Sequence, residues 1–510
     1  MLAKINSYGL IGIEGVPISV EVDLSFGMQR ADTVGLPDNA VKESKERVRS
    51  AICNSGYSYP EMRVLVNLAP ADIRKEGTVY DLPIALGILA ARGIFPIHAA
   101  DDYIIIGELA LDGQLRGVTG VLPMVIDAYE RGWRHFMLPI ENADEASYFA
   151  DMTVIPVRNL NEACEHFKGK NVISPYPQFQ WNAHKRQYTH DFAEIKGQQH
   201  AKRAAEIAVA GNHNLLMIGS PGSGKTMLAR SIPSILPELT MEESLEITRI
   251  HSVAGELRDR GGMITERPFR APHHSASIPA LVGGGTKALP GEISLAHYGV
   301  LFMDEFPQFP PAVLEALRQP LEDGVVTITR AAAKTTYPAD FMLVAAMNPC
   351  PCGNYGSKTK ECRCTPIQIE RYRNRISSPL LDRLDIHIEM TEVNYDDLTS
   401  KEMGESSESI RGRVEAARRI QRERYRDDGI LYNSQLNTPL MRKHCRMTEE
   451  AEDLLHTAYD KLKLSARAYT RVIKVARTIA DIEGAQTIQK AHVLEAVQYR
   501  GLDEKYWGAK

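Results

Sequence analysis

A glycine-rich segment that matches the pattern G-x-x-x-x-G-K-[ST] in full is the feature that most constrains this chain. It follows an apolar run at residues 215–218, which is predicted as a buried strand, and it opens a helical pattern. In this context, glycines let backbone N–H groups wrap phosphates, and the helix N-terminus adds positive potential. The lysine is a point charge for the β- and γ-phosphates, and the threonine offers a hydroxyl to Mg²⁺. We therefore predict a site for ATP and Mg²⁺ formed by Gly219, Ser220, Pro221, Gly222, Ser223, Gly224, Lys225 and Thr226.

Two further predicted strands end in polar groups suited to the same chemistry. The apolar run at residues 300–303 ends in two carboxylates, of which Asp304 can hold the Mg²⁺ shell and Glu305 can polarise an attacking water. Adjacent acids can serve separate roles because successive strand residues point in different directions. Asn348 ends the run at residues 341–347 and is placed to reach the γ-phosphate or the water. An asparagine before a proline is equally a common turn residue.

Composition excludes several classes of protein. The chain has 510 residues, of which 44% are hydrophobic and 25% charged, so it is neither disordered nor fibrous. Its net charge of −5, from 60 basic and 65 acidic residues, does not suggest a nucleic-acid partner on that sum alone. Apolar stretches are too short for a transmembrane helix, and the first residues lack the apolar segment of a signal peptide. We expect a cytoplasmic protein with no membrane partner.

The pattern of apolar residues divides the chain into three predicted domains. Residues 1–167 mix β-type and helical runs and predict an α+β domain, and residues 168–190 are polar, contain prolines and predict a linker. Residues 191–395 alternate β and α runs, which predicts an α/β fold with a parallel sheet covered by helices on both faces. Residues 396–510 predict an all-helical domain.

Arg383, in the segment Leu-Asp-Arg-Leu-Asp, is a candidate arginine finger. Supplied by a neighbouring subunit, it would stabilise charge on the phosphoryl group in the transition state. The flanking Asp382 and Asp385 allow the other interpretation, which is a surface ion pair.

Together these motifs resemble those of the ComM/YifB family of magnesium-chelatase-like AAA+ ATPases. The resemblance covers nearly the whole chain and implies an AAA+ core at 191–395 and a helical lid at 396–510. In that family ATP binds between subunits of a ring, normally a hexamer. The resemblance thus implies that Arg383 acts in the site of the neighbouring subunit. The residues that would act in the site of their own subunit are Lys225, Thr226, Asp304, Glu305 and Asn348. The motifs that carry it are the glycine-rich segment and the stretches 267–274, 283–285, 290–297, 299–305, 348–353 and 380–383.

The same resemblance suggests roles in the lid and at the N-terminus. The lid run 465–477 resembles the segment with the sensor-2 arginine, for which Arg467 is the first candidate and Arg471 the second. A solvated helix face is the other interpretation.

The N-terminal domain resembles the Lon-protease domain, related to ribosomal protein S5 domain 2, through residues 105–116. No serine occurs between residues 59 and 146, and Leu122 stands at the lysine position, so we expect no peptidase activity.

A predicted hairpin at residues 320–337 indicates what a motor of this kind acts on. Arg330 and Lys334 lie at or near its turn, in the place where MCM-type and chelatase-type AAA+ proteins carry a hairpin that projects into the pore. A ring of such cations can track a phosphate backbone without reading sequence. An exposed hairpin with ordinary surface cations is the alternative. Lys287 marks a second candidate pore loop, and a basic cluster, or a solvated face, is formed by Arg371, Arg373 and Arg375.

The chain has seven cysteines, and this odd number argues against a disulfide framework. Four of them fall within 15 residues. Cys350, Cys352, Cys362 and Cys364 form two closely spaced pairs that can give a tetrahedral structural Zn²⁺ site, with free or redox-active thiols as the alternative. For His273 and His274, which lie next to prolines, we expect a loop or core role rather than a metal or nucleotide role.

These features favour an ATP-dependent ring-shaped DNA motor, a helicase or branch-migration factor that acts on single-stranded or branched DNA. The family's association with natural transformation and recombination supports this hypothesis. A chelatase-type motor that remodels a protein partner for metal insertion is the alternative, although such subunits normally lack the long N-terminal domain. An ATP-dependent protease is disfavoured by the missing catalytic pair.

Overall fold

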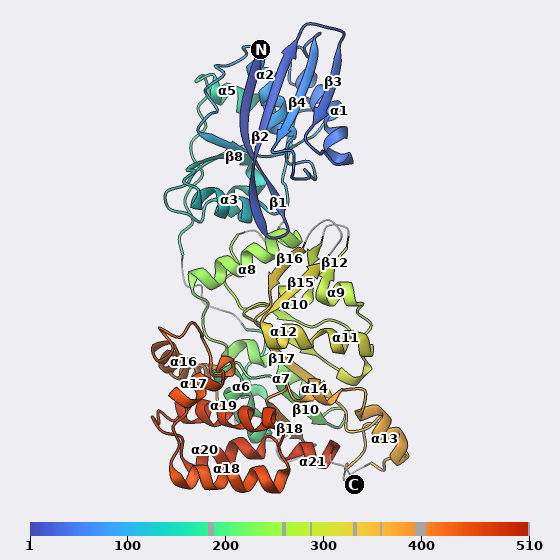
Figure 1. Ribbon diagram of the computed structural model, residues 1–510, viewed down its shortest axis with the longest axis vertical. Coiled ribbons are helices and arrows are strands. Elements are labelled where there is room, and N and C mark those ends of the chain that lie inside the picture. The colour runs from blue at the N-terminus through green and yellow to red at the C-terminus, as the bar shows by residue number, and fades with distance from the viewer. Residues whose placement is uncertain are drawn as a thin grey trace.

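The computed structural model describes residues 1–181, 188–257, 262–285, 288–329, 334–357, 360–392 and 404–507. Arg330 and Lys287, both named above for a pore, lie outside the described residues. The described chain forms three parts: the N-terminal part lies at one end of the long axis, and the last helices lie beside the half of the central part that is farther from it (Figure 1). No described helix is long and apolar enough to cross a membrane.

The N-terminal part is built on a seven-stranded mixed sheet in the order β3-β4-β2-β1-β5-β8-β9. Its strands are β1 Leu2–Ile11, β2 Glu14–Ser25, β3 Arg30–Val34, β4 Arg63–Ala69, β5 Tyr103–Ile105, β8 His135–Pro139 and β9 Thr153–Val157. A short ribbon of β6 Glu108–Leu109 and β7 Leu115–Arg116 lies beside it. The helices are α1 Asn39–Asn54, α2 Asp81–Ala91, α3 Val121–Glu130, α4 Ala143–Ala146 and α5 Leu160–Phe167. Every residue of α2 is buried, because this apolar helix packs against the sheet on one side and α1 on the other.

The central part contains the expected parallel sheet, in the order β11-β14-β17-β10-β18. Its strands are β10 Leu215–Gly219, β11 Phe269–Arg270, β14 Val300–Met303, β17 Met342–Met347 and β18 Ile386–Met390. The helices around it are α6 Gln199–Gly211, α7 Lys225–Ser231, α8 Met241–Ala254, α9 Ile278–Val282, α10 Glu292–Leu295, α11 Pro311–Ala316, α12 Arg318–Asp323, α13 Pro366–Arg373 and α14 Ser378–Leu381. β17 lies between β10 and β14, so the carboxyl ends of these three strands are neighbours.

The predicted hairpin is present as the antiparallel pair β15 Val325–Thr329 and β16 Lys334–Pro338, in which Thr329 faces Lys334. Val326, Ile328 and Tyr337 are buried and fasten it to the central core. Lys334 is exposed at the described end of β16.

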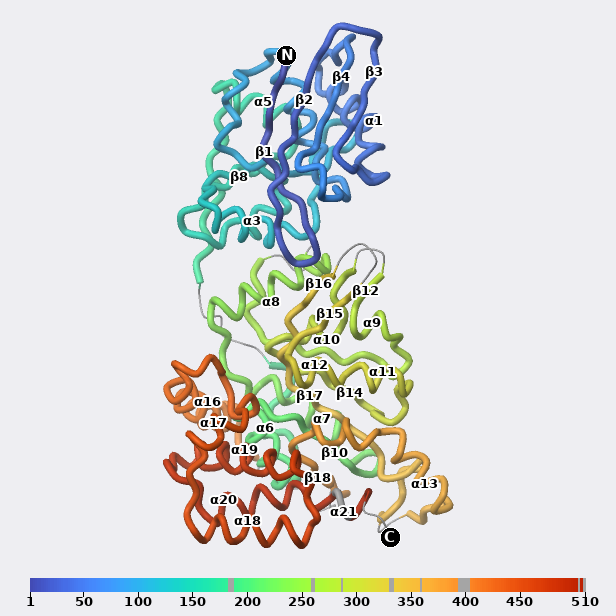
Figure 2. Tube along the Cα trace, viewed as in Figure 1, coloured from blue at the N-terminus to red at the C-terminus, as the bar shows by residue number. Residues whose placement is uncertain are grey.

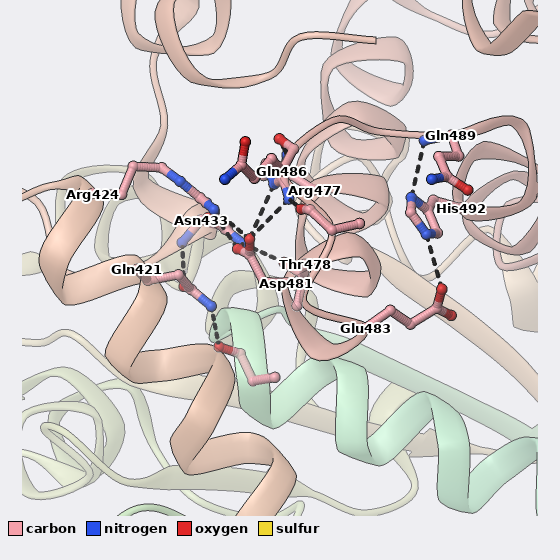
Figure 3. A network of polar contacts seen from close by, with 12 residues as sticks. Gln421, Arg424, Asn433, Arg477, Thr478, Asp481, Glu483, Gln486, Gln489 and His492 are labelled. Atoms are coloured by element: carbon pink, nitrogen blue, oxygen red, sulfur yellow. Dashed lines mark hydrogen bonds and ion pairs between the residues drawn. The ribbon is translucent and has the colours of Figure 1, made fainter. Parts of the chain in front are cut away.

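The last part consists of α16 Ser407–Arg424, α17 Thr438–His444, α18 Glu449–Leu462, α19 Ala466–Ile482, α20 Lys490–Gln498 and α21 Leu502–Trp507. The helices α16 to α20 share one apolar cluster with α6 and one face of the parallel sheet, whereas α21 packs on the cluster at the other face through Tyr506. A buried polar network reinforces this junction (Figure 3). Asp481 accepts from Arg424 at 2.9 Å, Asn433 at 2.9 Å and Arg477 at 3.1 Å, while Gln421 donates at 3.0 Å to a carbonyl of α6. The lid is thus packed on the sheet as one body with α6.

The turn between β1 and β2 contacts the central part, and Figure 2 shows it beside α8 and β16. Ile13, in this turn, is 8% exposed and belongs to the apolar cluster that contains Val326 and Ile328 of the hairpin. The Arg249 guanidinium donates to the Ile13 carbonyl at 2.8 and 3.0 Å. A side-chain carbon added at Gly12 of this turn would lie 2.3 Å from Thr335, which follows Lys334 in β16. The N-terminal part therefore contacts the β15–β16 hairpin near its tip.

Candidate nucleotide site

The glycine-rich segment forms the loop between β10 and α7, in the strand–loop–helix context that its sequence predicted. The Lys225 ammonium donates to the carbonyls of Gly219 at 2.7 Å and Ser220 at 2.9 Å. It also donates to the Asn348 side-chain oxygen at 3.3 Å, so the loop and the end of β17 meet at one cation.

Asp304 and Glu305 follow β14 on the other side of β17. The Thr226 hydroxyl donates to the Asp304 carboxylate at 2.9 Å, which brings together the two residues expected to surround Mg²⁺. The other oxygen of Asp304 accepts from the Glu305 backbone N–H at 2.8 Å. Asp304 is therefore held in place from both sides.

The Glu305 backbone adopts a left-handed conformation, with φ 51° and ψ 42°. This conformation is unfavourable for a residue with a side chain and turns the chain sharply at the end of the strand. The Glu305 carboxylate lies 3.1 Å from Nδ1 of His274. The rings of His273 and His274 are in contact, with centroids 4.0 Å apart.

These side chains surround one cavity of about 460 Å³. Its lining residues are Pro221, Gly222, Lys225, Thr226, Arg230, Ala271, Pro272, His273, His274, Phe302, Asp304, Glu305 and Asn348. The structure thus brings together side chains from the ends of three neighbouring strands and from the loop after β11. We expected a loop or core role for His273 and His274, and the structure places them in a loop that forms a wall of this cavity.

The charges in the cavity fit a nucleoside triphosphate with Mg²⁺. Lys225 is 8% exposed, and the hydrogen bonds of its ammonium in the described structure go to two backbone carbonyls and the Asn348 side-chain oxygen. Burial lowers the pKa of Lys225, which the Asp304 charge partly opposes. The Ser223 hydroxyl is buried without a partner in the described part of the chain. A buried cation that contacts only neutral oxygens is a site for an anion, and the adjacent carboxylate and hydroxyl are ligands that Mg²⁺ prefers.

The arginine-finger candidate lies outside this cavity. Arg383 is 5% exposed, and it donates to the Pro379 carbonyl at 2.6 Å and pairs with Glu322 of α12. Arg467, at the start of α19, is half exposed and lies 3.7 Å from the same carboxylate. Neither Asp382 nor Asp385 pairs with Arg383 in the described structure, so the local ion pair considered from the sequence is replaced by a pair with α12.

Arg471, the second sensor candidate, joins the lid to the sheet. Its guanidinium lies 2.6 Å from the fully buried Asp385, which also lies 3.4 Å from His213 and accepts from the Asn214 backbone N–H at 3.1 Å. Burial alone would raise the pKa of Asp385, but the charge of Arg471 and the contact with His213 lower it below its usual value. Asp385 is therefore a buried anion whose cationic partner is on the lid.

The structure corrects one predicted surface. Arg373 is buried, donating to the Pro349 carbonyl at 3.1 Å and lying over the rings of Tyr355 and Tyr506. It therefore does not belong to an exposed basic cluster. Arg371 and Arg375 are exposed, and Arg375 donates to the Pro307 carbonyl at 3.2 Å.

The four clustered cysteines converge after β17, with all four sulfurs within 4.8 Å of one another. All seven cysteines of the chain are free of disulfides. Backbone N–H groups of Asn354 and Arg363 lower the pKa of the Cys352 thiol to about 6, which favours its thiolate.

Sequence reasoning missed several contacts of the site. The pairing of His274 with Glu305 and of Asp385 with Arg471 joins residues far apart in the chain, and no local pattern indicates either pair. Arg230, which lines the cavity, has only the helical periodicity of α7 as a signal: it falls on the same side of the helix as Thr226.

Three family models match this chain. One described as magnesium chelatase, subunit ChlI, matches residues 191–398, one described as subunit ChlI of Mg-chelatase matches residues 20–142, and the C-terminal model of the same subunit matches residues 404–500.

Among similar proteins, YifB of Escherichia coli, described as uncharacterized, is 44% identical over 505 residues, covering 98% of this chain and 97% of that protein. Competence protein ComM of Haemophilus influenzae is also 44% identical, over 523 residues and 98% of both chains. The magnesium-chelatase 67 kDa subunit of Chlorobaculum parvum is 29% identical over 163 residues, covering 31% of this chain and 23% of that protein.

Proposed function

The chain belongs to the ComM/YifB family of magnesium-chelatase-like proteins, and we propose that it is an ATP-driven, ring-forming motor that acts on DNA in the cytoplasm. Its parallel sheet and C-terminal helices fit a chelatase-like AAA+ fold, and the family suggests ATPase activity. The observation that carries the ATPase proposal is the convergence of Lys225, Thr226, Asp304, Glu305 and Asn348 on one cavity.

Each of these side chains has a distinct role in hydrolysis. Lys225 compensates the charge of the β- and γ-phosphates, and Thr226 with Asp304 would hold Mg²⁺. When bound, Mg²⁺ neutralises charge on the phosphate oxygens. Glu305 orients and polarises the attacking water, and its contact with His274 holds the carboxylate at the cavity wall. Asn348 contacts Lys225 and is placed to sense the γ-phosphate.

Completion of the site requires a second subunit. Arg383 does not line the cavity of its own chain, as expected of a residue that reaches a neighbouring site in a ring. To act as a finger, its guanidinium would exchange the partly exposed Glu322 for a phosphate. Arg467, half exposed at the start of α19, is proposed as the sensor-2 arginine from the lid. A hexamer is the assembly that the family resemblance implies.

DNA is proposed as the substrate because of the β15–β16 hairpin and the relatives. Lys334 is exposed beside the hairpin tip, for which the sequence also supplies Arg330. One relative is named a competence protein, which fits a role in the uptake and integration of DNA. Repeated around a ring, the two cations would contact a phosphate backbone without reading its sequence.

The proposal is tested by measuring ATP hydrolysis with and without forked DNA, together with strand displacement and branch migration. We expect DNA to stimulate hydrolysis and expect movement of a branch point to require ATP. Glu305→Gln is the negative control, since it retains nucleotide binding but lacks the base. Hydrolysis that is indifferent to DNA, with no strand displacement or branch migration, would refute a DNA motor.

The hairpin assignment needs its own variant. The double change Arg330→Ala and Lys334→Ala should weaken DNA binding and reduce the slope of log affinity against log salt by about 1 to 2. The matched control is Lys461→Ala, which removes an exposed cation of α18. Equal DNA affinity of the double variant and the control would exclude the hairpin as the contact.

A chelatase-type motor that remodels a protein partner is the second candidate, favoured by the three matching family models of a chelatase subunit. It predicts robust hydrolysis that DNA does not change. The DNA assays above therefore separate the two candidates.

The domain division at 1–167, 168–190, 191–395 and 396–510 is also part of the proposal. The N-terminal domain is proposed as Lon-like without peptidase chemistry. Leu122, at the position expected for a catalytic lysine, is fully buried next to Tyr148 and Met263, where it supplies only apolar contact. Absence of peptide-bond cleavage in the presence of ATP is the expected result, and ATP-dependent proteolysis would contradict it.

A further inference from the structure

The four clustered cysteines have the spacing of ligands around one ion. The sulfur of Cys350 lies 3.4 Å from that of Cys352 and 3.7 Å from that of Cys362. The sulfurs of Cys352 and Cys362 are also 3.7 Å apart. A tetrahedral Zn²⁺ site with Zn–S distances of about 2.3 Å requires sulfurs about 3.8 Å apart. The three distances lie within about 0.4 Å of the edge of such a tetrahedron, and the Cys364 sulfur lies within 4.8 Å of the other three.

The backbone brings the two pairs together from opposite ends of one loop. Cys350 and Cys352 follow β17, and the Tyr355 backbone N–H donates to the Cys350 sulfur at 3.3 Å, which tightens the turn around it. Cys362 and Cys364 precede α13, whose first turn is fixed by the capping box of Thr365 and Gln368. The loop is thus closed at both ends by regular structure.

We propose that these four cysteines bind one structural Zn²⁺ ion that holds the loop after β17 in place and thereby positions Asn348 in the nucleotide site. Four thiolates select a soft or borderline cation over Mg²⁺ and leave no open position for catalysis. The role of the ion is therefore to fix geometry.

The loop is joined to the nucleotide site through the chain itself and through one direct packing contact. Asn348 is separated from Cys350 only by Pro349, whose carbonyl accepts from the buried Arg373. At Gly353, one residue beyond Cys352, an added side-chain carbon would lie 2.5 Å from the Pro221 ring, so the loop packs directly on the phosphate-binding segment. Loss of the ion frees the end of β17 where it meets Lys225.

Metal content tests the site independently of any activity. The full chain, purified after zinc-replete expression, should contain about one Zn²⁺ per chain, and the double variant Cys362→Ser and Cys364→Ser less than about 0.2. Cys53→Ser, an exposed cysteine on α1, is the matched control and should retain the ion. Cobalt-replaced protein should show the intense visible bands of tetrahedral thiolate coordination.

Less than about 0.5 Zn²⁺ per chain, iron in place of zinc, or equal zinc in the double variant and the wild type would overturn the site. These outcomes are read whether or not the protein hydrolyses ATP, so they are distinguishable from a failure of the proposed function.

The positioning role rests on the proposed ATPase function and is tested by kinetics. Without the ion, we expect kcat to fall about tenfold, with a smaller loss in affinity for an ATP analogue, because Asn348 acts on bound nucleotide. Added Zn²⁺ should restore kcat of chelator-treated wild type but not of the double variant. An unchanged kcat in zinc-free protein that still hydrolyses ATP would refute the positioning role while leaving the metal site intact.

Discussion

Adding one side-chain carbon at Gly353 should disrupt the packing of the cysteine loop on the glycine-rich segment at Pro221. Gly353 has φ +80°, and a side-chain carbon there would lie 2.5 Å from Cδ and 2.6 Å from Cγ of Pro221. Gly353→Ala should therefore displace the phosphate-binding segment and weaken ATP binding.

A matched glycine in the same loop separates backbone strain from this contact. Gly356 has φ +78°, but an added carbon there meets nothing within 4 Å. Both alanines pay about 1–2 kcal/mol for the left-handed backbone. Only Gly353→Ala adds the cost of overpacking, about 1–3 kcal/mol. The difference between the two variants corresponds to about 5- to 150-fold if it is expressed fully in ATP affinity.

The assay is titration of each variant with a fluorescent ATP analogue, with thermal unfolding to confirm that both are folded. Combining Gly353→Ala with Pro221→Ala removes the contacted ring and should recover part of the affinity. Equal affinities of the Gly353 and Gly356 variants would refute the reasoning. Should Gly353→Ala be too unstable to assay, loss of folding in that variant but not in Gly356→Ala still reports the contact.

Three further predictions concern the catalytic residues and the junction with the lid. Glu305→Gln should lower kcat about 10²- to 10⁴-fold with little change in nucleotide affinity, and an equal loss in affinity would contradict a role as base. Arg383→Ala should lower kcat about 10³-fold or more in the assembled ring, whereas Glu322→Gln, which breaks the same ion pair, should retain activity; equal losses would indicate a purely structural pair. Asp385→Asn leaves the lid cation Arg471 without its buried partner and should cost about 3–5 kcal/mol in urea unfolding. Because the folded-state pKa of Asp385 is depressed, the stability that it contributes should be present above about pH 4 and lost as the pH falls below it, and the Asn variant should lack this acid-side loss.

Local patterns were sufficient to predict the strand–loop–helix context of the glycine-rich segment and the strands around it. The fit of residues 219–226 to a strand–loop–helix motif depends on neighbours in the chain, so periodicity and glycine spacing identify it. The parallel sheet and the β15–β16 hairpin were predictable for the same reason. Because carboxyl ends of parallel strands meet at one edge, Asp304, Glu305 and Asn348 could be expected together.

Other features depended on contacts that no local pattern encodes. The burial of Arg373 follows from its packing against Tyr506 of the last helix, although its sequence neighbours suggested an exposed basic cluster. Ile13 lies in the short turn between β1 and β2, where side chains are usually exposed, but it is buried because the central core packs against it. Each contact joins segments that are more than 130 residues apart in the chain.

The sequence by itself thus predicts the glycine-rich loop between a strand and a helix and shows which four thiols lie close together in the chain, because those properties arise over a few residues. Tertiary packing decides that the thiols converge within 4.8 Å, that their loop rests on Pro221, and that Arg383 pairs with Glu322 outside its own cavity. The physical reason is that distances between groups on separate elements depend on how the sheet, the lid and the loop pack. Local propensity reports none of these distances.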